Sequence, residues 1–329
     1  MIKTTTKELL KSSKNLLAFS AGVDSSALFF ILKELEIPFD IAIVDYALRD
    51  QSKEEIAYAK ELAKKYNKVC FVKNAPKIKK NFEARAREIR YTFFEELISK
   101  YNYDNLLTAH HLGDRLEWFL MQFCKGAGCV ELSGMQEREE RQTYKLIRPL
   151  LHYEKSELLN YLHNNKLHYF EDESNSDEKY TRNIFRKKYA HPLLQTYLSG
   201  IKKSFAYMDE DKELLIQTVP VQKVNQLAIF LKQNSRSDIY HIDKYLKSLG
   251  HIMSQEERQL LKEKRDVVIG RKFIVTEIQD YICIAPYLTT KKLSKEFREK
   301  MRKAKIAPKL RPYLAEDPEA ELFLSRLFS

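Results

Sequence analysis

The stretch that decides the fold is LLAFSAGVDSSALFFIL, residues 16–32. An apolar run leads into a turn of small residues, and a helix with an apolar stripe follows. Such a turn at a helix N-terminus favours an anion, because backbone N–H groups turn inward and the helix dipole attracts negative charge. An ordinary turn with a serine cap explains the same residues equally well.

The turn matches neither of the two standard phosphate-binding patterns. The sequence contains no G-x-x-x-x-G-K-S/T, and Gly126-Ala127-Gly128 is followed by Glu131 where G-x-G-x-x-G requires a third glycine. A phosphate bound at residues 20–26 would therefore be held without the usual lysine, by backbone N–H groups and serine hydroxyls.

Outward from this stretch, strands and helices alternate. The pattern predicts strands at residues 15–19, 39–45, 69–73 and 105–109, separated by helices at 25–36, 52–66 and 82–100, with a further helix up to residue 123. This alternation is typical of an α/β, doubly wound parallel sheet of Rossmann-like type. Ligands bind such sheets at the carboxyl ends of the strands where the strand order reverses, so we expect the loops after strands one and four to face a common crevice.

The second half of the chain has a different texture. Residues 191–250 are predicted to be helical, residues 266–285 to form strands, and residues 294–303 to form a basic helix. We therefore predict three domains: a catalytic domain at 1–190, a helical linker domain at 191–255 and a small α+β domain at 256–329.

The composition favours a polyanionic partner. The 329 residues include 57 Lys and Arg against 46 Asp and Glu, a net charge of +11, which indicates nucleic acid before membrane, although a merely basic enzyme would show the same balance. Apolar stretches are far shorter than a membrane span needs, and no signal peptide is expected. The four cysteines form no Cys-x-x-Cys pair, which suggests free thiols and a cytoplasmic location.

Candidate catalytic groups follow the fourth predicted strand. Asp114 and Glu117 stand at i and i+3, so they share one helix face. Such a pair could hold Mg²⁺, bind an ammonium group or accept a proton, but a solvated helix face is the commoner fate. His110 and His111 are expected to be structural histidines before metal ligands.

Several motifs, in this order, resemble the bacterial tRNA(Ile)-lysidine synthetases, within the ATP pyrophosphatase superfamily. The turn is similar to the pyrophosphate loop Ser-Gly-Gly-x-Asp-Ser, with Ala21 in place of the first glycine. Ala-His-His-x-x-Asp-x-x-Glu at 109–117, Leu-Ser-Gly-Met at 132–135 and Arg-Pro-Leu-Leu at 148–151 follow. The most specific motif, Glu-Asp-x-Ser-Asn-x-Asp-x-x-Tyr-x-Arg-Asn-x-x-Arg, occupies 171–186. The resemblance covers about residues 14–190.

The chain departs from the family pattern at a few positions. Gly113 replaces the first of two adjacent aspartates, and in the segment 43–49 Ile43 and Tyr46 stand where the family has two histidines. Lys125 stands where arginine is usual, and Glu131 stands where glycine is usual.

The resemblance implies a ligase that uses ATP and Mg²⁺. The wobble cytidine of an isoleucine tRNA with a CAU anticodon would be adenylated at C2, and free L-lysine would then displace AMP to give lysidine. Asp114, Glu117 and Arg182 would be catalytic. The nucleotide would be bound by Ser20, Ala21, Gly22, Val23, Asp24, Ser25, Ser26, Val44 and His110, with Asp24 also holding Mg²⁺. The RNA would contact Arg49, Asn183, Arg186, Lys300, Arg302, Lys303 and Arg311.

Three other functions compete with this interpretation. A tRNA-thiolating enzyme would use the same loop but needs reactive cysteines. A small-molecule amide synthetase would not need the basic run at 291–311, and a non-catalytic RNA-binding relative would not need an intact loop. The oligomeric state is open, with a homodimer as one expectation.

Overall fold

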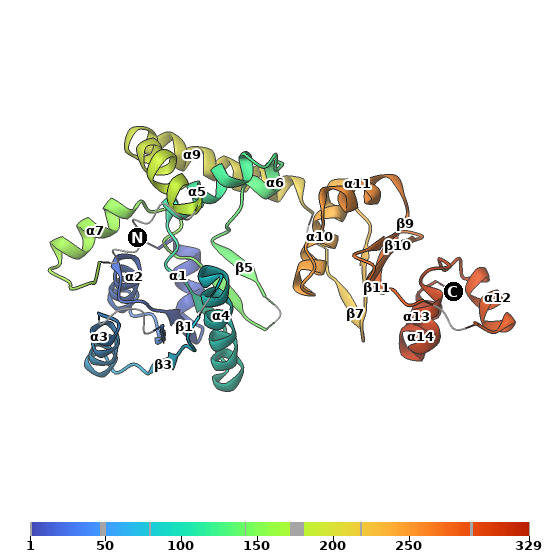
Figure 1. Cartoon of the computed structure of the whole chain (residues 1–329), viewed down its shortest axis with the longest axis horizontal. Helices are drawn as coiled ribbons and strands as arrows, with labels where there is room; N and C mark the ends of the chain where they lie inside the picture. Colours follow the sequence, from blue (N-terminus) through green and yellow to red (C-terminus); the bar gives the residue numbers. More distant parts are fainter. Residues whose placement is uncertain are drawn as a thin grey trace. The chain divides into compact units, whose positions relative to one another are not determined.

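The computed structural model describes residues 2–46, 51–78, 80–141, 143–171, 181–217, 219–289 and 292–328. The chain divides into two compact units, Met1–Asp209 and Glu210–Ser329 (Figure 1). No helix in these ranges is long and apolar enough to cross a bilayer.

The first unit is built on a six-stranded sheet of order β3-β2-β1-β4-β6-β5. Neighbouring strands are parallel except for β5, which runs antiparallel to β6. The strands are β1 (Asn15–Ala18), β2 (Phe39–Asp45), β3 (Cys70–Asn74), β4 (Asn105–Leu107), β5 (Arg138–Glu140) and β6 (Lys145–Ile147). The predicted α/β class and parallel sheet are therefore confirmed.

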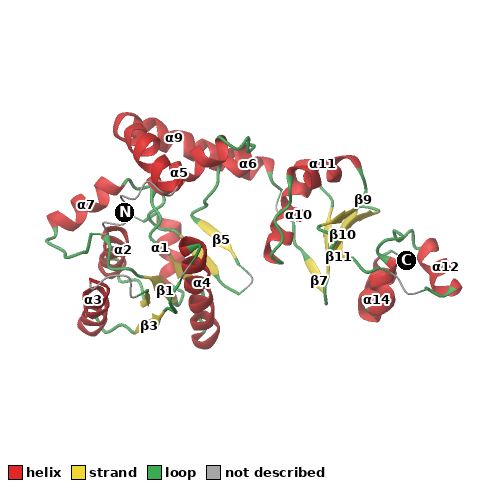
Figure 2. Ribbon diagram, viewed as in Figure 1, coloured by secondary structure: helices red, strands yellow, loops and turns green. Residues whose placement is uncertain are grey.

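Helices cover both faces of this sheet (Figure 2). Adjacent residues of β1 point to opposite sides, since Leu17 joins a core that includes residues of α2, α3 and α7, whereas Leu16 joins a core with residues of α4. The helices are α1 (Thr4–Lys11), α2 (Val23–Glu34), α3 (Gln51–Lys65), α4 (Phe82–Tyr101), α5 (Leu112–Phe123), α6 (Cys129–Leu132), α7 (Lys155–Asn164), α8 (Thr181–Phe185), the π-helix η2 (Arg186–Ala190) and α9 (His191–Leu215).

The strand order reverses between β1 and β4. From β1 the chain moves outward through β2 to β3, then returns to the other side of β1 to form β4. The loops that follow β1 and β4 leave the same edge of the sheet side by side, as the sequence predicts.

The second unit contains an antiparallel sheet of order β7-β8-β11-β10-β9. Its strands are β7 (Gln222–Val224), β8 (Leu227–Leu231), β9 (Asp266–Ile269), β10 (Phe273–Ile278) and β11 (Tyr281–Pro286). One face packs against α10 (Ser235–Ser248) and α11 (Gln255–Glu263), the other against α12 (Lys295–Lys303), α13 (Arg311–Glu316) and α14 (Pro318–Leu327).

The strands predicted at 266–285 are confirmed, but the helical prediction for 191–250 is wrong at β7 and β8. Residues of β8 are buried alternately against α10 and against the C-terminal helices, so this segment is apolar on both faces. A short continuous apolar run looks the same in a buried strand and a buried helix. The domain boundaries at 190 and 255 stay predictions. In the structure the boundary between the two compact units falls after Asp209, and β8 and β11 belong to the same sheet of the second unit.

Candidate active site

The loop after β1 is locked by its own hydrogen bonds. Ala21 adopts a left-handed backbone with φ of 59° and its side chain is fully buried. The Ser26 hydroxyl donates to the Ala21 carbonyl at 3.1 Å, and the Ser25 hydroxyl accepts from the Ser20 N–H at 3.2 Å. Gly22 caps α2, and a Cβ there would meet only Ser20 Oγ at 3.6 Å and the Phe170 carbonyl at 3.9 Å. The result is a preformed turn with a helix N-terminus behind it.

A segment far along the chain braces this loop. The Phe170 N–H donates to the Ala21 carbonyl at 2.9 Å, and Gly22 and Phe170 form a parallel bridge. Phe170 packs against Tyr58, whose hydroxyl donates to the His168 carbonyl at 2.7 Å. The loop is therefore tied to the chain just before the acidic motif, most of which, at 172–180, lies outside the described residues.

Asp24 projects from the first turn of α2 with one oxygen unsatisfied. Its Oδ1 is buried and has no hydrogen-bond partner among the described residues. Burial raises the pKa of this carboxyl, because the charged form has lost water without gaining a donor. A buried carboxylate oxygen beside a phosphate-binding turn fits a Mg²⁺ ligand, although the described residues hold no cluster of three such groups.

The loop after β4 brings His111 next to Asp24. His111 caps α5: its Nδ1 accepts from the Gly113 N–H at 3.0 Å, while the Asp114 carboxylate accepts from the His111 N–H at 3.0 Å. Since Nδ1 is an acceptor, Nε2 carries the proton, and it lies 3.6 Å from Asp114 Oδ2 and 3.9 Å from Asp24 Oδ2. The two loops thus meet, as expected from the strand order.

The geometry of the His111 cap explains why residue 113 is a glycine. A Cβ at Gly113 would lie 2.6 Å from Cε1 of the His111 ring, closer than two carbon atoms can approach. The absence of a side chain at Gly113 therefore gives His111 the space in which it caps the helix.

Two carboxylates and two guanidinium groups form the centre of the site. Arg182 donates from Nη2 to Asp114 Oδ1 at 2.5 Å and from Nε to Glu117 Oε2 at 2.8 Å. Arg186 donates from Nε to Glu117 Oε1 at 2.6 Å. The side chains of Asp114 and Glu117 are 11% and 2% exposed, against 39% and 31% for the two arginines. The carboxylate pair is buried, so the solvated-face interpretation is wrong.

The charges around Asp114 keep it ionised. Burial opposes the charged form, but His111, whose N–H donates to the carboxylate, and the Arg182 guanidinium outweigh burial and hold the pKa of Asp114 well below its usual range. Burial also lowers the pKa of His110 to about 4, with Asp114 opposing and Arg148 adding to the shift. His110 is therefore neutral at pH 7, and its Nδ1 lies 2.9 Å from the Thr108 hydroxyl.

A buried arginine fixes the helix that carries the carboxylates. Arg115 is 1% exposed, forms a bidentate ion pair with Asp209 of α9 and donates to the Ser133 carbonyl at 3.1 Å. Its guanidinium also lies over the Phe205 ring, 4.4 Å from the centroid. Sequence reasoning missed this contact, because Arg115 and Asp209 are 94 positions apart and no pattern links them.

The structure brings together part of the predicted set. Residues 20–26, His110, Asp114, Glu117, Arg182 and Arg186 lie on the two loops and on the helices packed at them. Val44 lies near the carboxyl end of β2, half-buried, and Asn183 is buried in α8. Arg49 lies outside the described residues. Lys300, Arg302, Lys303 and Arg311 belong to the second unit.

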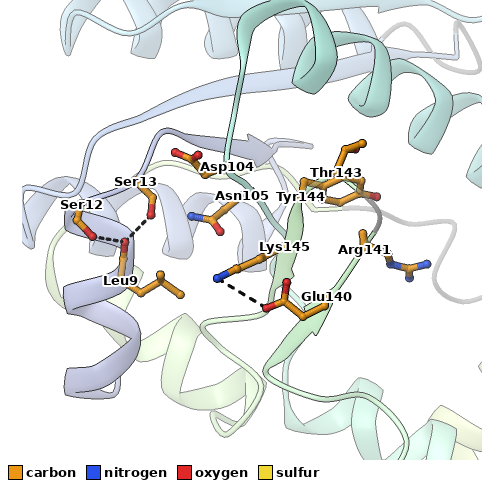
Figure 3. A pocket seen from close by; sticks show the side chains of 10 residues that line it. All are labelled: Leu9, Ser12, Ser13, Asp104, Asn105, Glu140, Arg141, Thr143, Tyr144 and Lys145. Atoms are coloured by element: carbon orange, nitrogen blue, oxygen red, sulfur yellow. Dashed lines mark hydrogen bonds and ion pairs between the residues drawn. The ribbon is translucent and has the colours of Figure 1, made fainter. Parts of the chain in front are cut away.

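An open cavity lies elsewhere in the unit. A cavity of about 400 Å³ is lined by Ser13, Asn105, Tyr144, Lys145 and their neighbours (Figure 3). Asn105 and Lys145 are the first residues of β4 and β6, so the cavity opens at the amino ends of the strands. In the close view Lys145 points toward Glu140, with Nζ 3.7 Å from the carboxylate. The candidate site lies at the opposite edge.

The chain is similar to a known domain family, to curated proteins and to solved structures. A family model described as the PP-loop domain matches residues 1–193. A tRNA(Ile)-lysidine synthase of Wolinella succinogenes is 47% identical over 95% of this chain and 96% of the relative. Another, of Campylobacter jejuni strain RM1221, is 43% identical over 95% and 96%. Among solved structures, the U34-tRNA thiolase NcsA of Methanococcus maripaludis aligns with a TM-score of 0.52 and 17% identity over 64% of this chain and 76% of the thiolase, a likeness of fold alone.

Proposed function

Because the chain belongs to the tRNA(Ile)-lysidine synthase family and carries a PP-loop domain, we propose that it joins lysine to the wobble cytidine of an isoleucine tRNA, using ATP. The observation that carries this proposal is the buried carboxylate pair beside the phosphate-type turn. Asp114 and Glu117 together accept hydrogen bonds from two cationic side chains. A site that holds guanidinium groups in this way has the charge and the acceptors to hold an alkylammonium group.

The first step is adenylation. The turn at residues 20–26 holds the two outer phosphates through backbone N–H groups, the serine hydroxyls and the N-terminus of α2. Oxygen O2 of the cytidine forms a bond to the α phosphorus, and the bond to pyrophosphate breaks. Arg182 stabilises the negative charge on the α phosphate, and Arg186 stands one helical turn behind it.

The second step needs a cation to be exchanged. When Arg182 turns to the α phosphate, Asp114 and Glu117 lose one guanidinium donor and can take the ε-ammonium of lysine. Lysine must give up a proton before it attacks, since its pKa is about 10.4 in water, and the carboxylate pair accepts that proton. The nitrogen then bonds to C2 of the base while the C2–oxygen bond breaks, so AMP leaves with the oxygen.

Asp24 is the residue that would hold Mg²⁺. Its unsatisfied oxygen suits a cation that takes its other ligands from phosphates and water, as Mg²⁺ commonly does. When bound, Mg²⁺ would neutralise charge on the phosphate oxygens. His111 Nε2 lies 3.9 Å from Asp24 and 3.6 Å from Asp114, so the three side chains share one crevice.

The cations of the second unit are proposed to contact tRNA phosphates. Lys303 is exposed on α12, and Lys300 and Arg302 are exposed but paired with Glu321 and Glu299. Arg311 donates to the Ile306 carbonyl at 3.0 Å, which gives it a role in the fold as well. A homodimer and a cytoplasmic location stay predictions.

One experiment tests the function. The protein is incubated with ATP, isotopically labelled lysine and an unmodified isoleucine tRNA transcript, and the nucleosides are analysed by mass. We expect lysidine, AMP and pyrophosphate in equal amounts, and an adenylated tRNA when lysine is left out. A transcript with uridine at the wobble position is the control and should give no product. Release of ADP, or sulfur in place of lysine on the tRNA, would overturn the proposal.

A further inference from the structure

Trp118 lies next to the carboxylate pair and remains partly exposed. It is the only tryptophan of the chain and is 41% exposed. It follows Glu117 directly and stands four positions after Asp114 on α5. Residues at i and i+4 of a helix lie on the same face, about 6 Å apart, so the indole stands one helical turn from the site where lysine and cytidine are proposed to react.

The backbone of Gly134 fixes the position of the indole. Gly134 has φ of 58°, and a Cβ there would lie 2.4 Å from Trp118 Cδ1 and 2.8 Å from Nε1. The indole edge therefore rests against the Gly134 backbone. The preceding residue is held in turn, because the Ser133 carbonyl accepts a hydrogen bond from the buried Arg115. This gives the Leu-Ser-Gly-Met motif at 132–135 a role: its glycine makes room for the ring.

The faces of the indole ring are the next feature of Trp118. Among the described residues no ring stacks on Trp118 and no cation lies over it, whereas Phe123 of the same helix stacks on Phe119 at 6.0 Å and 13°. Trp118 is thus held at one edge and keeps a free surface beside a catalytic crevice. Aromatic side chains presented in this way are what single-stranded RNA loops use for base stacking.

We propose that Trp118 stacks on a base of the anticodon loop adjacent to the cytidine that reacts at Asp114 and Glu117. The inference rests on the proposed function, since it names a contact for the same RNA. Charge supports an RNA occupant: the chain carries +11 overall, and Lys125, just beyond the end of α5, is exposed. Stacking here would hold the neighbouring nucleotide while the reacting base enters the crevice.

The single tryptophan makes the test direct. Emission excited at 295 nm is followed in the full-length protein while an unmodified isoleucine tRNA transcript is added, with binding measured separately by filter retention. We expect saturable quenching that follows the binding curve. Lysine alone should leave the emission unchanged; quenching by lysine alone would place the indole over the ammonium group and overturn base stacking.

Variants separate stacking from packing. Trp118→Ala should weaken tRNA binding roughly 5- to 100-fold, the range expected for one base–aromatic stack, and Trp118→Phe should recover most of the loss. Trp118→Leu keeps apolar contact with Gly134 and should behave like the alanine variant. Phe123→Ala, a 62% exposed aromatic on the opposite face of α5, is the matched control and should bind normally.

Failure of this inference can be told from failure of the function. Normal lysidine formation with unchanged emission and unchanged affinity in Trp118→Ala would reject the stacking contact and leave the ligase intact. No tRNA binding and no lysidine in the wild-type protein would reject both.

Discussion

Basic side chains do different things in the candidate site of the first unit and on α12 of the second. In the first, Arg182 and Arg186 reach carboxylates 65 to 69 positions away, one of them only 2% exposed. In the second, Arg302 pairs with Glu299 three positions away on the same helix, where both side chains are about half exposed or more. Buried pairs of this kind are costly to leave incomplete, whereas exposed ones are worth little. The role of a charge is thus set by how deeply it and its partner are buried.

The largest expected effect lies in the buried set. Asp114→Asn removes the charge that would hold lysine but keeps an oxygen that can cap α5, so the fold should survive. We expect lysidine formation to fall about 10²- to 10⁴-fold, measured by nucleoside mass analysis, with ATP binding retained. Wild-type yield from this variant would remove Asp114 from the site.

The next largest effect is expected at the ion pair between Arg115 and Asp209, which supports α5. Asp209→Ala leaves the buried Arg115 guanidinium without its carboxylate, and the free energy of unfolding should fall by about 3 kcal/mol, measured by urea denaturation. Glu210→Ala, the exposed neighbour, is the control. Adding Arg115→Met to Asp209→Ala should recover part of the lost stability. Equal stability of Asp209→Ala and the wild type would mean that the ion pair does not stabilise the fold.

A smaller effect is expected from the exposed set. Reversing Lys300, Arg302 and Lys303 to glutamate should weaken tRNA binding about tenfold and flatten its salt dependence by about one unit of slope for each lost phosphate contact. ATP binding should not change. Lys303→Glu alone should have more effect than Arg302→Glu, whose charge is already paired.

The matched control applies the same change of net charge to the first unit. It reverses three exposed lysines of α3, namely Lys60, Lys64 and Lys65. If this variant loses as much tRNA affinity as the α12 variant, the loss comes from the overall positive potential of the protein and not from contacts made by α12.

The last effect is absent near pH 7 and concerns how stability changes as the pH falls. His110 has a folded-state pKa of about 4 because it is buried, against about 6.5 in the unfolded chain. Between these values the unfolded chain takes up a proton that the folded chain does not, so stability should fall as pH falls from about 6.5 to 4. Urea titrations at several pH values should show a shallower fall for His110→Asn; parallel curves would contradict this.

Sequence reasoning worked best where strand ends fix the position of a loop. The turn at 20–26 and the residues from His110 to Glu117 follow strands that pair with one another, so their meeting was predictable from the α/β alternation. It worked less well for charge. A run of lysines and arginines predicts a positive electrostatic potential. It does not predict that Arg302 pairs with Glu299 or that Arg311 donates to a backbone carbonyl.

What sequence could not show are contacts between distant segments. Nothing in the local pattern predicts that Phe170 bridges Gly22 or that Arg115 meets Asp209. For Asp114 and Glu117 the spacing gave a shared face, while their burial depends on α8 and η2 packing over α5. Similarly, β8 became a strand because helices cover both its faces.

Ala21 holds a conformation that costs an L-residue about 1–2 kcal/mol relative to the right-handed one, and its methyl group lies wholly in the core. The bend it makes is therefore set when the domain folds and does not wait for a nucleotide. A phosphate that arrives there meets amide dipoles already aimed, so little conformational entropy is lost on binding and more of the contact free energy appears as affinity.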